Sequence, residues 1–121
     1  DKILLNKQDI VEVEELFLED AVVAVLCYGF TARSALTAVK QLRDKGYKVG
    51  FFRLKTIWPF PHEQIAQMSE EVEKFFVPEM NRGQVAGEAM KSSRCEVVPY
   101  CQTNGEIIPP EVIRKELMRL L

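Results

Sequence analysis

Few cysteines and a single histidine limit the metal and redox chemistry open to this sequence. The three cysteines, Cys27, Cys95 and Cys101, form no C-x-x-C pair, and none is close in sequence to His62, the only histidine. A zinc site needs several thiolate or imidazole ligands at short, regular spacings. We therefore expect three free thiols, no disulfide and no metal, with each cysteine packed as a small apolar side chain.

An excess of either charge is also missing. The chain has 16 basic and 18 acidic residues and a formal net charge of −2. Nucleic acids and anionic membranes recruit proteins through clustered lysine and arginine, so neither is an expected partner. No apolar run approaches the ~20 residues of a membrane span, and residues 1–17 carry acidic and amide side chains where a signal peptide would be apolar. We expect a cytoplasmic protein.

The common catalytic and nucleotide motifs are absent as well. A dinucleotide fingerprint needs G-x-G-x-x-G, and the only glycine at the corresponding turn is Gly29; there is no Walker motif and no G-x-S-x-G elbow. A response regulator would carry acidic residues where Tyr28 and Gly29 stand, and an aspartate where Glu79 stands. His62 stands one residue into a helix behind Pro61, where we expect a surface residue of the first turn rather than a base. We therefore expect no catalytic residue.

What remains is a chain of the size and composition of one folded domain. It has 121 residues, of which 47% are hydrophobic, enough for one apolar core but not for two. We expect a single domain over residues 1–121, with residues 1–8 as a loose linker. Because the chain begins without methionine, we expect it to be a fragment of a longer subunit.

Five segments have the pattern of β-strands. Residues 10–14 alternate apolar and acidic side chains, as at the edge of a sheet, whereas 21–28 and 48–54 are nearly unbroken apolar runs, typical of strands buried on both faces. Residues 74–79 contain Pro78, so this strand should stop there or lose a ladder hydrogen bond. Residues 95–101 contain Pro99, which places that strand near an edge.

Helical spacing separates these strands. The first helix runs from Thr31, as its N-cap, to Gly46, as its stop, and a modest helix is expected over 85–90. Strands that alternate with helices favour right-handed crossovers and a mostly parallel sheet, so the fold class is α/β in three layers, α/β/α. The inward stripes of the other two helices are Ile65, Met68, Val72 and Phe75, after Pro61, and Val112, Leu117 and Leu120, within 109–121.

The carboxyl ends of the strands are where open α/β sheets bind ligands. Gly29, Thr31 and Arg33 are candidates for weak anion binding there, although Gly29 also suits the turn and Thr31 also suits the helix cap. Together with Asn81, these residues define one alternative hypothesis, a stand-alone nucleotide- or coenzyme-binding domain.

Two further segments are candidates for contacts with other chains or domains. In "RLKTIWPFPHEQI", a proline on each side of Phe60 restricts the backbone, so the aromatic rings lose little entropy on docking, although they can equally cover the local core. In "EMNRGQ", residues 79–84, polar side chains gather at a strand end, where they also suit a turn and a cap. The interaction candidates are Trp58, Phe60, Glu79, Asn81, Arg82 and Gln84.

Four stretches in this order resemble one known family: "YGFTARSALTAV", "GYKVGFFRLKTIWPFP", "EMNRGQ" and "GEIIPPEVI". Over residues 10–113 the chain is similar to the C-terminal domain of the α subunit of 2-oxoacid:ferredoxin oxidoreductases, in particular the 2-oxoglutarate type. More widely, it resembles the C-terminal domain of transketolase-like thiamine enzymes. The resemblance implies a five-stranded mixed sheet whose first strand is antiparallel to the others.

The resemblance also implies a parent activity. The parent enzyme would oxidatively decarboxylate a 2-oxoacid with thiamine diphosphate and coenzyme A, and pass electrons through iron–sulfur clusters to ferredoxin. This domain resembles the part that carries none of those cofactors. Its implied partners are the thiamine-binding domain of the same subunit, the other subunits and, through the complex, ferredoxin. We expect a non-catalytic domain that contributes by position.

Overall fold

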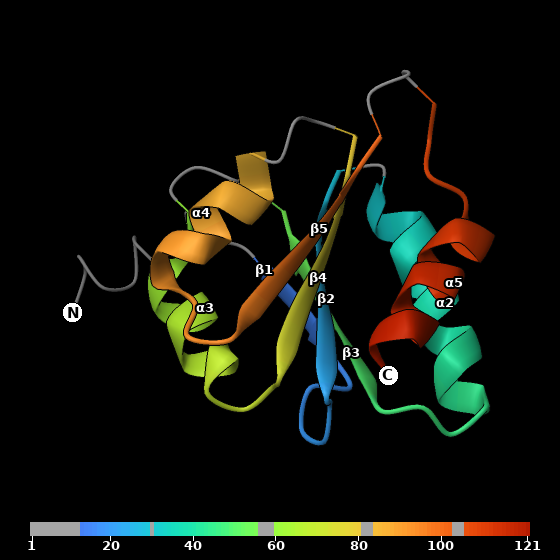
Figure 1. Ribbon diagram of the computed structural model, residues 1–121, viewed down its shortest axis with the longest axis horizontal. Coiled ribbons are helices and arrows are strands. Elements are labelled where there is room, and N and C mark those ends of the chain that lie inside the picture. Colours follow the sequence, from blue (N-terminus) through green and yellow to red (C-terminus); the bar gives the residue numbers. More distant parts are fainter. Residues whose placement is uncertain (1–12, 30, 56–59, 81–83, 103–105) are drawn as a thin grey trace.

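The computed structural model describes residues 13–29, 31–55, 60–80, 84–102 and 106–121. Figure 1 shows the sheet between two pairs of helices, with α3 and α4 on one face and α2 and α5 on the other. This arrangement confirms the three-layer α/β/α class. The elements in chain order are β1 (Val13–Leu16), β2 (Val23–Tyr28), α2 (Thr31–Asp44), β3 (Val49–Leu54), α3 (His62–Ser69), β4 (Lys74–Glu79), α4 (Gln84–Ser92), β5 (Glu96–Cys101) and α5 (Pro110–Leu120).

The sheet has five strands in the order β1-β3-β2-β4-β5. β1 pairs antiparallel with β3, and the remaining neighbours pair parallel. The mixed sheet with an antiparallel first strand is therefore confirmed. The observed β1 overlaps the expected 10–14 segment only at its end and continues to Leu16, while residues 10–12 lie outside the described ranges.

The unbroken apolar runs reflect burial on both faces of the sheet. In β2, Val23, Val25 and Cys27 pack with α2 and α5, whereas Ala24 and Leu26 pack on the face covered by α3 and α4. All five are at most 1% exposed. Because consecutive side chains point to opposite faces, a strand covered twice has no position for a polar residue.

Two glycines mark the ends of α2 as expected. Gly29, at the turn before the helix, has φ of 67°, and Gly46, after it, has φ of 90°. At the end of α2 the amide of Gly46 donates to Arg43 O at 3.0 Å and the amide of Tyr47 donates to Leu42 O at 3.0 Å. This pair of bonds is a Schellman motif, which satisfies the last carbonyls and needs a left-handed residue.

Two expected helical stripes are partly wrong. α3 ends at Ser69, so Val72 lies in the following turn and Phe75 in β4, although both are buried in the same core as Ile65 and Met68. The apolar residues kept a helical spacing past the end of the helix, and burial alone does not show where helix becomes strand. In α5 the fully buried residues are Ile113 and Leu117, with Val112 and Leu120 at the margin of that core.

β4 continues through Pro78 to Glu79, so the strand does not stop at the proline. The amide of Gln102 donates to Glu79 O, which shows that the backbone of Glu79 faces β5. In a parallel strand successive residues turn their backbone groups to alternate neighbours, so the nitrogen of Pro78 faces β2. The β2–β4 ladder ends at the pair Val25 and Phe76, and the proline lies beyond that end.

The same alternation explains Pro99 in β5. Because Gln102 bonds toward β4, the nitrogen of Pro99 faces away from β4, on the outer side of the sheet. β5 pairs with β4 alone, which confirms the expected edge position. A proline without a donor is tolerated at such a position.

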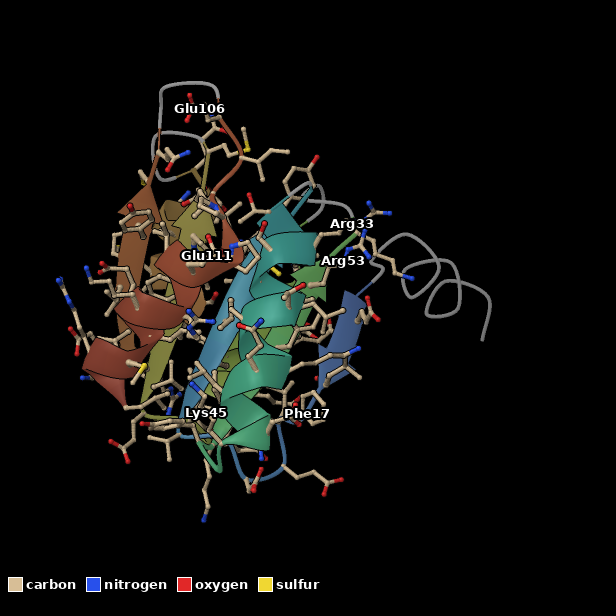
Figure 2. The ribbon with its side chains drawn as sticks, turned by 90° about the vertical axis from the view of Figure 1, so that its right-hand side faces the viewer. Phe17, Arg33, Lys45, Arg53, Glu106 and Glu111 are labelled. Atoms are coloured by element: carbon tan, nitrogen blue, oxygen red, sulfur yellow. The ribbon has the colours of Figure 1, made fainter. Side chains whose placement is uncertain are left out.

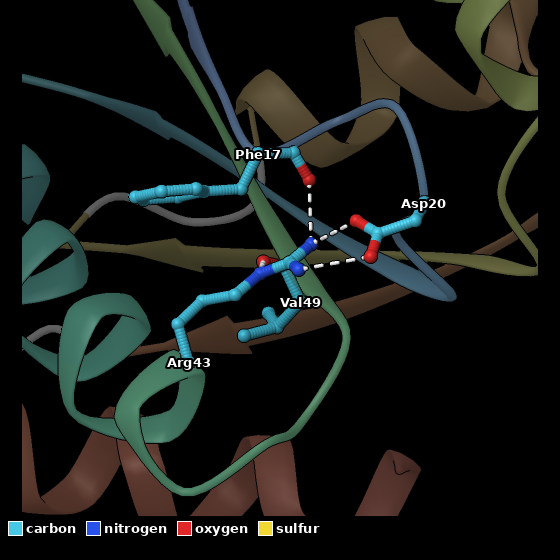
Figure 3. Close-up of polar contacts among 4 residues, drawn as sticks. All are labelled: Phe17, Asp20, Arg43 and Val49. Atoms are coloured by element: carbon cyan, nitrogen blue, oxygen red, sulfur yellow. Dashed lines mark hydrogen bonds and ion pairs between the residues drawn. The ribbon is translucent and has the colours of Figure 1, made fainter.

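Arg43 joins three segments at the amino end of the parallel strands (Figure 3). Its Nε donates to Val49 O at 2.8 Å, and its Nη2 donates to Phe17 O at 2.7 Å. Both terminal nitrogens bond the carboxylate of Asp20, at 2.7 and 3.2 Å, and these bonds hold the pKa of that carboxyl below its usual range. The guanidinium also lies over the ring of Phe17, whose φ is 59°. One side chain therefore fixes the end of α2, the start of β3 and the β1–β2 turn.

Replacing Arg43 with methionine should lower the free energy of unfolding by about 1–3 kcal/mol, because the carbonyls of Phe17 and Val49 lose charged donors while the apolar stem is kept. Urea unfolding followed by circular dichroism measures the change.

Arg119→Met is the matched control, since Arg119 is 67% exposed and its ion pair with Glu116 is 3.7 Å long. The control should change the free energy of unfolding by less than about 0.5 kcal/mol. Equal losses in the two variants would contradict the structural role of Arg43.

Candidate functional site

The carboxyl ends of β2 and β4 separate from one another. The two strands pair only where residues 23–25 meet residues 74–76, whereas β2 runs on to Tyr28 and β4 to Glu79. From these ends the chain leaves in opposite directions, to α2 on one face and to α4 on the other (Figure 1). This is a topological switch point, the place where open α/β sheets form ligand crevices.

A cavity of about 330 Å³ occupies this fork. Its walls are mainly apolar side chains from both strands and from the first turn of α4, and its polar groups are few. The lining residues are Leu26, Cys27, Tyr28, Gly29, Thr31, Val77, Pro78, Glu79, Met80 and Val85. Its volume is at the small end of the range for ligand pockets, roughly 300–1,000 Å³, and its mainly apolar lining is typical of them.

The carboxylate of Glu79 is buried in this fork and caps α4. Its Oε1 accepts the amide of Val85 at 2.9 Å, its Oε2 accepts the amide of Ala86 at 3.0 Å, and the residue is 4% exposed. These amides belong to the first turn of the helix, where backbone donors lack partners within the helix and the dipole is positive. The negative charge is thus compensated by the helix that follows it.

Cys27 lines the cavity but is not a reactive thiol. Burial raises the pKa of the Cys27 thiol far above its usual range, and the opposing charge of Arg53 offsets only part of this effect. The Sγ lies 3.7 Å from Phe52 O, as a weak hydrogen bond inside the sheet. Because the thiolate is the nucleophile, a neutral buried thiol supplies none.

The structure brings together two of the three anion candidates. Gly29 and Thr31 line the cavity, with Thr31 buried at the start of α2, whereas Arg33 is not among the lining residues. In Figure 2, Arg33 projects from α2 toward the side of the sheet where β1 lies. An anion beside Gly29 and Thr31 would therefore meet the carboxylate of Glu79 at the opposite wall. Asn81, the fourth residue of the alternative hypothesis, lies outside the described residues.

The structure describes some of the interaction candidates and leaves others outside the described ranges. Phe60 is 7% exposed, belongs to the core under α3 and lies against the ring of His62 with centroids 4.8 Å apart. This position fits the interpretation that Phe60 covers the local core, and a role in contacts with other domains stays a prediction. Gln84 is exposed as the first residue of α4. Trp58, Asn81 and Arg82 lie outside the described ranges.

One polar cluster was not found from the sequence. His62 Nδ1 lies 3.0 Å from Ser92 Oγ, and His62 Nε2 lies 3.3 Å from Glu88 Oε1. Glu88 also accepts from Lys91 Nζ at 2.8 Å, which is the main cause of its lowered pKa. Glu88 and Ser92 are four residues apart on one face of α4, and this spacing was the available signal.

This cluster has the residue types of a hydrolase triad without its setting. None of its residues lines the cavity at the fork, and none lines a second cavity of about 440 Å³ between β1 and α3. A triad also needs a place for the reacting carbonyl and donors for its oxyanion. The cluster therefore acts as a link between α3 and α4.

The cofactors implied for the family do not fit the described residues. Within the described ranges no three His, Cys, Asp or Glu side chains are grouped to hold a metal ion, and the cavity at the fork offers a carboxylate rather than cations to a diphosphate. The expectation that the domain itself carries no cofactor stays a prediction. No helix in the same ranges is long and apolar enough to cross a bilayer.

Glu79→Gln should lower the free energy of unfolding by about 1–3 kcal/mol. A glutamine oxygen can accept one of the two α4 amides, but its NH₂ group cannot accept the other, which is then left without a partner in a buried place. The control is Glu111→Gln, in the exposed first turn of α5, which should cost less than about 0.5 kcal/mol. Equal effects in urea unfolding would contradict the capping role of Glu79.

Comparison with known proteins places this geometry in a family. Residues 21–113 match the family described as pyruvate:ferredoxin oxidoreductase core domain II. The chain is 38% identical over 120 residues to a 2-oxoglutarate synthase subunit KorA of Methanothermobacter marburgensis, covering 98% of this chain and 32% of that protein. A ketoisovalerate oxidoreductase subunit VorB of the same organism is 36% identical over 95 residues, covering 78% of this chain and 27% of the relative.

Solved structures agree with the sequence comparisons. A 2-oxoglutarate:ferredoxin oxidoreductase from Magnetococcus marinus matches with a TM-score of 0.83 and 25% identity, over 98% of this chain and 21% of that chain. A split-gene transketolase matches with a TM-score of 0.68 at 14% identity, over 88% of this chain and 40% of that one, which shows the shared fold alone. The chain spans about a third of the length of the KorA relatives. It belongs to the family of pyruvate:ferredoxin oxidoreductase core domain II, within the 2-oxoacid:ferredoxin oxidoreductases.

Proposed function

We propose that this chain is the non-catalytic C-terminal domain of the α subunit of a 2-oxoacid:ferredoxin oxidoreductase, and that 2-oxoglutarate is the substrate of the parent enzyme. The observation that carries the non-catalytic role is Glu79: the helix N-terminus that would face a ligand at the β2–β4 fork is occupied by the chain's own carboxylate. The substrate is supported by relatives named 2-oxoglutarate synthase, which match nearly the whole chain.

The groups at the fork support a positional role over a chemical one. The thiol of Cys27 is held neutral by burial, and both carboxylate oxygens of Glu79 are engaged by α4. General acid–base or nucleophilic catalysis needs such groups free to exchange a proton or attack. The alternative of a stand-alone coenzyme-binding domain is disfavoured because the described cavity residues offer no cation to a phosphate.

Exposed apolar residues at the carboxyl edge give the domain a surface for packing. Tyr28, the last residue of β2, is 37% exposed, and Ile107, between β5 and α5, is 56% exposed. Through this edge the domain packs on the thiamine-binding domain of its own subunit and on the other subunits. Thiamine diphosphate, coenzyme A and the iron–sulfur clusters are held elsewhere in this cytoplasmic complex, which reduces ferredoxin.

Ile107→Asp in the full-length subunit should weaken assembly about tenfold, because a charge replaces an apolar contact, while the specific activity of the complex that does assemble stays unchanged. Light scattering after size exclusion measures assembly, and coenzyme A-dependent reduction of an electron acceptor by 2-oxoglutarate measures activity. Met118→Asp is the control, since Met118 is 46% exposed on α5, away from this edge.

Two results would contradict the proposal. Full assembly with lost activity would make the edge catalytic, and an equal loss of assembly in both variants would remove the edge as the contact. Substrate choice is tested on the unmodified complex, for which kcat/KM should be at least tenfold higher with 2-oxoglutarate than with a branched-chain 2-oxoacid. The reverse order would assign the parent to the substrate named for the ketoisovalerate relatives.

A further inference from the structure

The cavity at the β2–β4 fork is large enough to admit a long side chain. It is about 330 Å³ in volume and opens at the carboxyl edge, where β2 and β4 part. Leu26, Val77, Pro78 and Val85 supply apolar walls. Lysine and arginine bury their aliphatic stems against walls of this kind while the charged end reaches a polar group.

The negative charge of Glu79 in the cavity favours a positively charged side chain as its occupant. Among the described lining residues Glu79 is the only charged one, and each of its oxygens accepts a single backbone amide. A carboxylate offers about four lone-pair positions, so it can accept further hydrogen bonds. Burial and, to a lesser extent, the charge of Glu79 raise the pKa of the thiol of Cys101, its partner in β5. An anion is repelled here and a cationic donor is attracted.

The part of the parent subunit outside this chain can supply such a side chain. The chain covers about a third of its relatives' length, and exposed Tyr28 lines the same cavity. We propose that a lysine or arginine from an adjoining domain or subunit of the parent enzyme enters this cavity and pairs with Glu79. This inference rests on the proposed packing function of the carboxyl edge. The pair would fix the register of the contact, because a buried carboxylate discriminates strongly against an apolar or acidic neighbour.

The structure of the assembled parent complex, determined by electron cryomicroscopy, tests the proposal. The expected result is a lysine or arginine nitrogen, from outside residues 1–121, within ~4 Å of the Glu79 carboxylate, the usual limit for an ion pair. A cavity that is empty, or filled by an apolar side chain, a phosphate or part of a coenzyme, would overturn it. If the edge is nevertheless covered by the neighbouring domain, the packing function stands without the ion pair; if the edge faces solvent, both fail.

A second measurement separates pairing from capping of α4. Glu79→Gln and the substitution of the partner lysine or arginine by methionine are made singly and together in the full complex, and the half-life of activity at elevated temperature is compared. Each single substitution should shorten the half-life about tenfold, and the double variant should be no shorter-lived than Glu79→Gln alone. Independent, multiplying effects would overturn the pairing. Glu111→Gln, in the exposed first turn of α5, should leave the half-life unchanged.

Discussion

The interaction on which the carboxyl edge depends is the bond between the Glu79 carboxylate and the first turn of α4. A buried carboxylate is costly unless its charge is matched, and here two backbone amides and the helix dipole match it. Many α/β proteins leave the corresponding amides to a phosphate. In this chain the carboxylate of Glu79 binds these amides instead, which holds α4 against the end of β4.

The two ends of the sheet are built differently. At the amino end, Arg43 binds two backbone carbonyls and Asp20, so helix, strand and turn are joined by one guanidinium. At the carboxyl end, β2 and β4 separate, and Tyr28 and Ile107 are exposed. At the amino end the chain's own side chains bond the backbone, whereas the carboxyl end exposes apolar side chains. This asymmetry supports the proposed role of the domain, in which a rigid unit positions a neighbouring domain.

The layers and the strands could be predicted because apolar runs report burial on both faces, and the glycines after β2 and α2 report left-handed turns. The partners of individual backbone and side-chain groups could not be predicted, because they depend on which neighbouring element each group faces. Pro78 is harmless only because its nitrogen points past the end of the β2–β4 ladder. Glu79 was visible as a polar residue in a loop, but not as a cap five residues before its helix. The pair of His62 and Ser92 joins residues 30 apart, a separation that no sequence period reveals.

Pro99 has a consequence for the edge of the sheet. β5 turns a nitrogen without hydrogen toward the outside, in a strand that begins with the charged Glu96. A second sheet laid against this edge would find a missing donor in the middle of the ladder, so Pro99 disfavours pairing of β5 with a strand of another chain.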